Sequence, residues 1–135
     1  MKYRACLFCN KVLSKRFQRK FCSNRCQADY RYKTFKEEWL TGKRKVITKN
    51  ISVPIKRFLL EKYGDKCALC GWNKKNSSTG YSPLEVDHLD GNSENNCIEN
   101  LRILCPNCHS LTPSFRNLNK GKGRSWRKQY LKKKI

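Results

Sequence analysis

Apolar residues at helical spacing predict a helix near the middle of the chain. Ile55, Phe58 and Leu59 fall on one face of a segment that Pro54 would open and Gly64 would end. This apolar face is expected to pack in a core. Proline at the first helical position and glycine just past the last one are common helix boundaries.

Short apolar runs predict two strands and one further helix in the second half of the chain. The sequences Leu-Glu-Val (84–86) and Leu-Arg-Ile-Leu (101–104) are predicted strands, and the polar stretch 90–96 between them is a predicted loop. The sequence CPNCHSL (105–111) then begins a helix. The expected order is therefore strand, loop, strand, helix.

The flanking segments are polar and basic. Ser23 or Asn24 is expected to cap a helix that runs through residues 27–40. These patterns predict four parts: a first domain with its helix, a basic linker with four basic and no acidic residues, a second domain, and a basic tail, at residues 1–40, 41–53, 54–118 and 119–135.

The composition indicates that the fold needs reinforcement beyond a hydrophobic core. Only 38% of the 135 residues are hydrophobic, and mean hydropathy is −0.84. The N-terminal sequence lacks the features of a signal peptide, and no run approaches transmembrane length. We therefore expect a cytoplasmic protein without membrane association, in which thiols stay reduced and the nine cysteines serve metal binding.

Eight of the nine cysteines form two sets of paired ligands. Each set has four thiolates, which suits one tetrahedral structural zinc ion, so the sequence predicts two such ions. Disulfides are the alternative for the first set. The ninth, Cys97, lies outside any such pair and is expected to be a small buried residue. The two sets are Cys6, Cys9, Cys22 and Cys26, then Cys67, Cys70, Cys105 and Cys108.

The charge predicts a polyanionic partner, most simply nucleic acid. Lysine and arginine number 31 against 10 acidic residues, for a net charge of +21. The alternative is a merely solubilising or ribosome-like surface. Trp126 and Tyr130 in the tail either dock on the protein or stack on bases. The candidate DNA-binding residues are Lys15, Arg16, Arg19, Lys20, Lys43, Arg44, Lys45, Arg116, Lys120, Lys122, Arg124, Arg127 and Lys128.

Both histidines of the chain stand next to predicted metal ligands. His88 follows Asp87 at the end of the first predicted strand, and His109 lies at the start of the last predicted helix. Folding the hairpin would bring these side chains together. A carboxylate and an imidazole can hold a divalent cation, and a second imidazole can take a proton from water near neutral pH. The sequence therefore predicts a hydrolytic metal site.

The sequences LEVDH and ENLRILCPNCH resemble the HNH endonuclease family of phages and mobile elements, in its zinc-bearing branch. The resemblance covers residues 67–116, and the spacing of the first four cysteines resembles small fingers found beside phage nuclease domains. It implies a small zinc-stabilised α+β fold: a ββα-metal (HNH, treble-clef-like) nuclease core plus an N-terminal four-cysteine zinc finger. Homing, DNA packaging with a partner protein, and host defence are the contexts it implies.

The resemblance also implies a role for each site residue. His88 is expected to be the general base, Asp87 and His109 to bind a catalytic magnesium or manganese ion, and Asn100 to hold the loop that aims His88. Products would carry 5′-phosphate and 3′-hydroxyl ends. One hairpin cuts one strand, so a monomer would nick duplex DNA, and a double-strand break would need a dimer or two nicks.

Each of these residues also has a purely structural interpretation. Asp87 and Asn100 would then serve turns, His88 would be a structural histidine, and His109 a spare zinc ligand. The protein as a whole would then be a non-enzymatic zinc-finger protein that binds nucleic acid. A nuclease that cuts RNA is a third hypothesis.

Three further residues near the site have weaker predictions. Glu85 shares a strand face with Asp87 and is expected to be a solvated carboxylate, the alternative being a contact with the metal through water. Asp90 is expected to serve the turn that follows. Arg102 would contact a phosphate or pair with Glu99.

Overall fold

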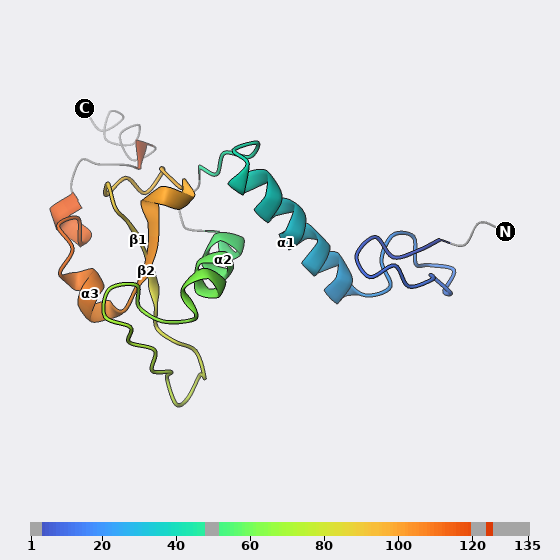
Figure 1. The fold of residues 1–135 in the computed structure, drawn as a ribbon, viewed down its shortest axis with the longest axis horizontal. Coiled ribbons are helices and arrows are strands. Elements are labelled where there is room, and N and C mark those ends of the chain that lie inside the picture. Colours follow the sequence, from blue (N-terminus) through green and yellow to red (C-terminus); the bar gives the residue numbers. More distant parts are fainter. Residues whose placement is uncertain (1–3, 48–51, 120–123, 126–135) are drawn as a thin grey trace, which may run out of the picture. The chain divides into compact units, whose positions relative to one another are not determined.

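The computed structural model describes residues 4–47, 52–119 and 124–125 (Figure 1). It divides into two compact units, Met1–Arg44 and Lys45–Ile135. The first unit contains helix α1 (Asn24–Leu40), and the second contains the remaining helices and both strands.

The first unit is a cysteine-bearing loop region followed by α1. The loop region closes on itself through a bridge between Ala5 and Val12. The hydroxyl of Ser23 accepts a hydrogen bond from the backbone N–H of Cys26 at 3.2 Å and so caps α1. This confirms the predicted helix, with Ser23 as the cap. Phe35 and Trp39 are buried one turn apart and stack at 6.1 Å.

Helix α2 (Val53–Tyr63) contributes two buried residues to the core of the second unit. Ile55 and Leu59 are completely buried, as their helical spacing predicts. Gly64 ends the helix in the left-handed conformation with φ 69°, which a residue with a side chain rarely adopts.

Further buried residues of this core lie in or beside an antiparallel hairpin. Strand β1 (Glu85–His88) pairs with β2 (Leu101–Leu104), and Asp87 lies opposite Arg102. Leu84, just before β1, is buried together with the apolar residues of β2. The strand begins one residue later and ends two residues later than predicted, so Asp87 and His88 belong to the sheet itself.

Helix α3 (Pro106–Ser110) follows β2 directly, so the hairpin lies between α2 and α3 (Figure 1). Two short 3₁₀ helices, η1 (Ile98–Asn100) and η2 (Arg116–Asn119), were not predicted. The result is the expected small α+β fold with a two-stranded sheet.

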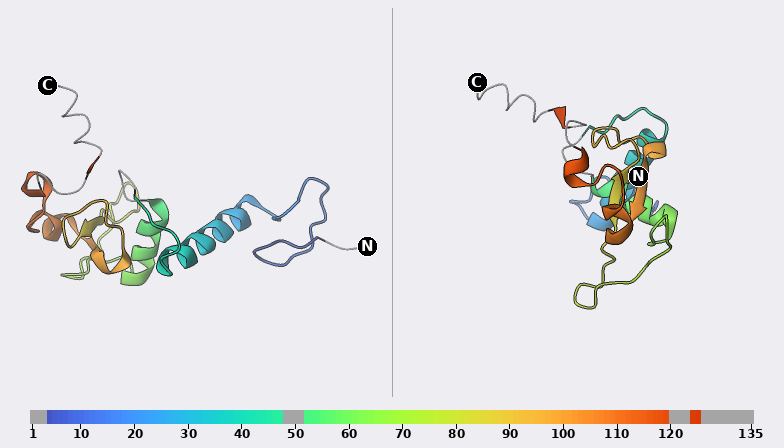
Figure 2. Two further views of the ribbon diagram at one scale, coloured as in Figure 1. Left: turned by 90° about the horizontal axis from the view of Figure 1, so that it is seen from above. Right: turned by 90° about the vertical axis from the view of Figure 1, so that its left-hand side faces the viewer.

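The segment before β1 and the loop after it differ in how tightly they pack. Residues 73–83 project from the unit as an exposed loop (Figure 2). The loop after β1 is compact: Gly91 is buried with φ 72°, and a Cβ there would lie 2.8 Å from the amide oxygen of Asn119. Within residues 4–47, 52–119 and 124–125, every helix is too short or too polar to cross a membrane.

One prediction about the core is wrong. Cys97 was expected to be buried, but its side chain is exposed. The neighbouring Asn96 takes the buried position instead, with 5% of its surface exposed.

Candidate metal and catalytic centre

Four cysteines fasten the hairpin to the segment that precedes it. The sulfur atoms of Cys67, Cys70, Cys105 and Cys108 all lie within 4.8 Å of one another. Cys70 and Cys105 are 3.7 Å apart. Sulfurs bound to one tetrahedral zinc ion, at about 2.3 Å each, lie about 3.8 Å apart. The tetrad therefore could hold zinc.

This tetrad also fixes helix α3 at the end of β2. The thiol of Cys105 caps α3 by accepting a hydrogen bond from the backbone N–H of Cys108. The backbone N–H of Ala68 donates to the carbonyl of Ile103 at 2.9 Å, which joins the first cysteine pair to β2. Any ion bound here would hold α3, and with it His109, against the hairpin.

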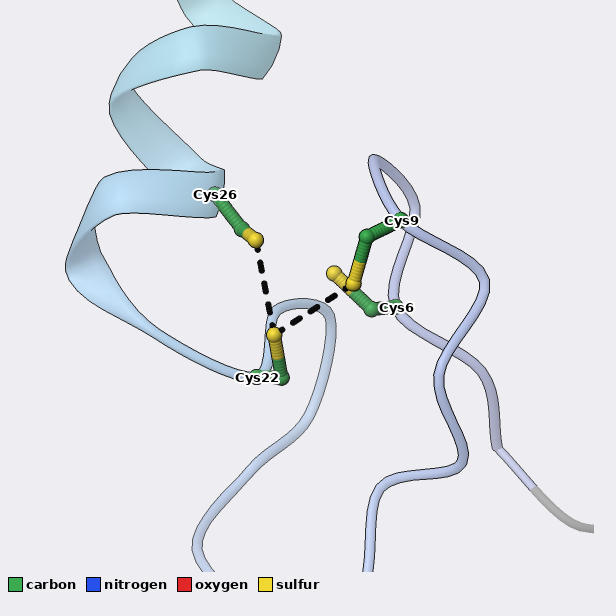
Figure 3. A group of neighbouring side chains, drawn as sticks. All are labelled: Cys6, Cys9, Cys22 and Cys26. Atoms are coloured by element: carbon green, nitrogen blue, oxygen red, sulfur yellow. Dashed lines mark hydrogen bonds between the residues drawn. The ribbon is translucent and has the colours of Figure 1, made fainter.

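The first unit carries a second tetrad of the same kind (Figure 3). Cys6 and Cys9 come from one loop, whereas Cys22 and Cys26 come from the residues around the start of α1. The sulfur of Cys22 lies 3.5 Å from that of Cys9 and 3.4 Å from that of Cys26. These separations also suit a tetrahedral ion.

Each tetrad contains one thiol with a lowered pKa and one with a raised pKa: Cys6 and Cys22 in the first unit, Cys67 and Cys108 in the second. Burial alone would raise the pKa of Cys67, but backbone N–H groups, with that of Cys105 contributing most, lower it to about 6. The neighbouring sulfurs of Cys70 and Cys105 raise the pKa of Cys108 to about 12. A bound dication removes this opposition, because it stabilises all four thiolates.

A second cluster joins β1, β2 and α3. Asp87 is 4% exposed, and its Oδ2 accepts a hydrogen bond from Nε of Arg102 at 2.7 Å. Its other oxygen lies 3.9 Å from Nε2 of His109. The opposite ring nitrogen, Nδ1, contacts the carboxylate of Glu85. Two carboxylates of one strand face thus flank the same imidazole.

The position of His109 is further supported on its C-terminal side. Its carbonyl accepts a hydrogen bond from the hydroxyl of Thr112 at 2.9 Å, and its ring meets the edge of Phe115 at 5.3 Å. The Glu85 carboxylate fixes the orientation of the ring, because it occupies Nδ1 and leaves Nε2 towards Asp87.

His88 belongs to a neighbouring group of side chains. Its Nε2 lies 3.0 Å from the amide oxygen of Asn96. The amide nitrogen of Asn96 donates to the carbonyl of Val46 at 2.9 Å. Among the described residues, hydrogen bonds therefore link His88, through Asn96, to the loop after β1 and to Val46. Asp87 and His109 instead face each other.

Asn100 fastens the loop that follows β1. Its amide oxygen accepts from the backbone N–H of Asp90 at 3.0 Å. Its amide nitrogen donates to the Asp90 carboxylate at 2.9 Å and to the carbonyl of Asn95 at 2.8 Å. Asp90 therefore serves the turn, as predicted. Although burial favours the neutral acid, hydrogen bonds from Asn95, from a backbone N–H and from Asn100 lower the pKa of Asp90.

The HNH endonuclease family matches residues 67–112, which include the cysteine tetrad of the second unit and all the residues of the cluster that joins β1, β2 and α3. The segment is an HNH endonuclease domain. A curated relative, "H-N-H endonuclease F-TflIV" of Escherichia phage T5, is 47% identical over 60 residues, which are 42% of this chain and 24% of that protein. The chain thus spans about a quarter of the length of that relative. No solved structure matches the chain.

Two residues of the HNH domain have contacts that the sequence did not reveal. The Glu85 side chain is 57% exposed, as expected of a solvated carboxylate, and it also contacts the imidazole of His109. Arg102 pairs with Asp87, a partner that the sequence prediction did not include. Strand alternation places Glu85 on the face of Asp87, but only the position of α3 brings a histidine to that face.

A divalent cation fits the pair formed by Asp87 and His109. An octahedral magnesium ion holds its ligands at about 2.1 Å, so two ligand atoms of one ion are at most about 4.2 Å apart. The 3.9 Å separation is slightly below the trans distance, so a small adjustment of either side chain would let both atoms bind one ion. One carboxylate and one imidazole leave other coordination positions for water and phosphate, as is usual for magnesium.

The predicted DNA-binding residues that the structure describes are all exposed. The sequence predictions at Lys120, Lys122, Arg127 and Lys128, and those at Trp126 and Tyr130, lie outside the described residues. In the first unit, the ammonium group of Lys15 lies 5.8 Å from the ring centre of Phe17, which is 78% exposed. The predicted DNA-binding residues found exposed are Lys15, Arg16, Arg19, Lys20, Lys43, Arg44, Lys45, Arg116 and Arg124.

Proposed function

We propose that this chain is a metal-dependent endonuclease that hydrolyses phosphodiester bonds of DNA to 5′-phosphate and 3′-hydroxyl ends. The observation that carries the proposal is the 3.9 Å approach of Asp87 and His109 inside the matched HNH segment. Binding alone does not require a buried carboxylate aimed at an imidazole. The name of the phage relative supports the same activity.

Asp87 and His109 would hold the catalytic cation, magnesium or manganese. When bound, the cation supplies charge stabilisation for the scissile phosphate and the leaving 3′ oxygen. Asp87 keeps one oxygen free for this role, because Arg102 engages only Oδ2. His109 offers Nε2, because Glu85 contacts Nδ1.

His88 would act as the general base that takes a proton from the attacking water. A histidine suits this role near neutral pH, since its unperturbed pKa is about 6.5. Asn100 would act on the position of His88 rather than on the substrate. It fastens residues 90 and 95 of the loop that begins directly after β1.

The two cysteine tetrads would each hold a structural zinc ion. In the HNH domain this ion would keep α3 on the hairpin and so hold His109 near Asp87. In the first unit it would make residues 1–40 a zinc finger. A basic linker (41–53), the nuclease domain (54–118) and a basic tail (119–135) complete the proposed organisation.

The exposed basic residues would bind the phosphates of duplex DNA. Such contacts give affinity that falls steeply with salt and carry no sequence information. With one hairpin per chain, the expected product is a nick. Because the named relative belongs to a phage, we propose that the protein acts in the cytoplasm of a bacterial host.

The proposal is tested with supercoiled plasmid incubated with the zinc-loaded protein and either magnesium, manganese or EDTA. We expect open-circular DNA to form only with added cation. DNA ligase should reseal these nicks, because it requires adjacent 5′-phosphate and 3′-hydroxyl ends. Tight, salt-sensitive binding without cleavage under every condition would contradict the proposal and favour a zinc-finger binding protein.

A further inference from the structure

Asn96 is a buried amide between the ring of His88 and the backbone of residue 46. Only 5% of its surface is exposed. Its two ends contact Nε2 of His88 at 3.0 Å and the carbonyl oxygen of Val46 at 2.9 Å. The residues it joins are far apart in the chain, so neither local turn geometry nor helix capping explains the position.

The contact with Val46 decides which way the amide points. A backbone carbonyl can only accept a hydrogen bond, so the nitrogen of Asn96 must face it. The flipped amide would put two acceptor oxygens 2.9 Å apart. The amide oxygen therefore faces His88.

The direction of the amide in turn decides which ring nitrogen of His88 carries the proton. A neutral imidazole has one donor nitrogen and one acceptor nitrogen. Since the Asn96 oxygen can only accept, the hydrogen bond at 3.0 Å requires a proton on Nε2. The lone pair then lies on Nδ1.

We propose that Asn96 is a positioning residue that holds His88 in the Nε2–H tautomer, so that Nδ1 is the atom that accepts the proton from water. This inference rests on the proposed function for the role of His88, but the tautomer itself follows from the hydrogen bonds. Asn96 acts through His88 and contacts no reacting atom.

The surroundings hold Asn96 in place for this purpose. The carbonyl of Asn95, the residue before it, accepts a hydrogen bond from Asn100 at 2.8 Å. Val46 directly follows the basic residues at 43–45. The asparagine is therefore held by the loop on one side and by the carbonyl of Val46 on the other.

The tautomer can be measured directly by nitrogen-15 NMR of the imidazoles. The chain has only two histidines, so the spectrum is simple, and His109→Gln assigns it. The zinc-loaded protein would be studied without magnesium at about pH 8.5, where an ordinary histidine is neutral. We expect His88 to show a protonated Nε2 and an unprotonated Nδ1.

Three variants separate the proposed role from simple packing. Asn96→Leu removes the acceptor at similar volume and should give a mixture of tautomers. Asn96→Asp loses the donor to the Val46 carbonyl and should be less stable, but it keeps an acceptor for His88 and should retain the wild-type tautomer. The exposed Asn73→Leu is the matched control and should change nothing. Zinc content and the signals of His109 verify that each variant is folded.

Cleavage kinetics provide the second readout. Asn96→Leu should lower kcat by about 10- to 100-fold with KM unchanged, as loss of an orienting partner typically does. Asn96→Asp should retain more activity than Asn96→Leu. A merely structural role predicts equal losses in both variants.

Two results would overturn the inference: a wild-type His88 protonated on Nδ1, or an unchanged tautomer in folded Asn96→Leu. A wild-type His88 protonated on Nδ1 would overturn the inference even if Asn96→Leu does not fold. If the spectra are as expected but the wild type cleaves no DNA with any cation, the proposed function fails while the tautomer assignment stands.

Discussion

Replacing Asn100 by alanine should destabilise the HNH domain strongly for a single polar substitution. The side chain is buried, and it makes three hydrogen bonds with the loop after β1. Alanine removes all three. It also leaves the backbone N–H of Asp90 and the carbonyl of Asn95 without these partners.

The expected loss of stability follows from the groups to which Asn100 is hydrogen-bonded. Two of the bonds join neutral groups and contribute about 1 kcal/mol each, whereas the bond to a carboxylate contributes about 1.5 kcal/mol. We therefore expect Asn100→Ala to lower the free energy of unfolding by about 3 to 4 kcal/mol. Asn76→Ala is the matched control. Asn76 accepts hydrogen bonds from the backbone N–H groups of Ser78 and Thr79 at 2.9 and 3.0 Å, but it is exposed. Its loss should cost under about 1 kcal/mol.

Amide hydrogen exchange of β2 in the presence of zinc measures the free energy of unfolding of the HNH domain alone. A further variant tests the hydrogen bonds against packing. Asn100→Asp keeps the shape but places a carboxylate oxygen against the Asp90 carboxylate and the Asn95 carbonyl. It should therefore be less stable than Asn100→Ala. The reasoning is refuted if the aspartate variant is the more stable of the two, or if Asn100→Ala costs no more than Asn76→Ala.

Three further predictions concern the ion pair, the zinc ligands and the orienting carboxylate. Arg102→Met leaves the buried Asp87 carboxylate without its cation and should cost about 3 kcal/mol, and magnesium should raise the melting temperature of this variant more than that of the wild type. Equal magnesium effects would contradict this. Cys67→Ser should reduce bound zinc, measured by mass spectrometry, from two ions per chain to one, whereas Cys97→Ser should leave two; equal zinc content would exclude the proposed ligand set. Glu85→Gln should weaken manganese binding in calorimetry by about tenfold, because the contacted histidine loses its orienting partner. An unchanged Kd would show that this contact is incidental.

The elements of the fold could be predicted because their signals are local. Helix α2 follows from the spacing of Ile55 and Leu59 and from Gly64 at its end. The tetrads follow from paired cysteines, whose spacing a single ion demands. Such patterns need only a few neighbouring residues.

The polar contacts of the site could not be predicted because they depend on register and on distant segments. The pairing of Arg102 with Asp87 depends on which residues of the two strands lie opposite each other. The contact of Asn96 with Val46 spans 50 positions. For Cys97 and Asn96, hydrophobicity favoured burial of the cysteine, but the buried position went to the residue with hydrogen-bond partners.

The central claim, that His88 is the base of a metal-dependent nuclease, is tested most directly by chemical rescue. Plasmid cleavage by the wild type and by His88→Gly would be compared with saturating manganese, with gel shifts to verify equal DNA binding. We predict that the variant binds DNA but cleaves it about 10²- to 10⁴-fold more slowly, and that added imidazole restores part of the rate. Cleavage by His88→Gly at the wild-type rate, or a loss that no imidazole concentration relieves, would contradict the assignment of His88 as the base.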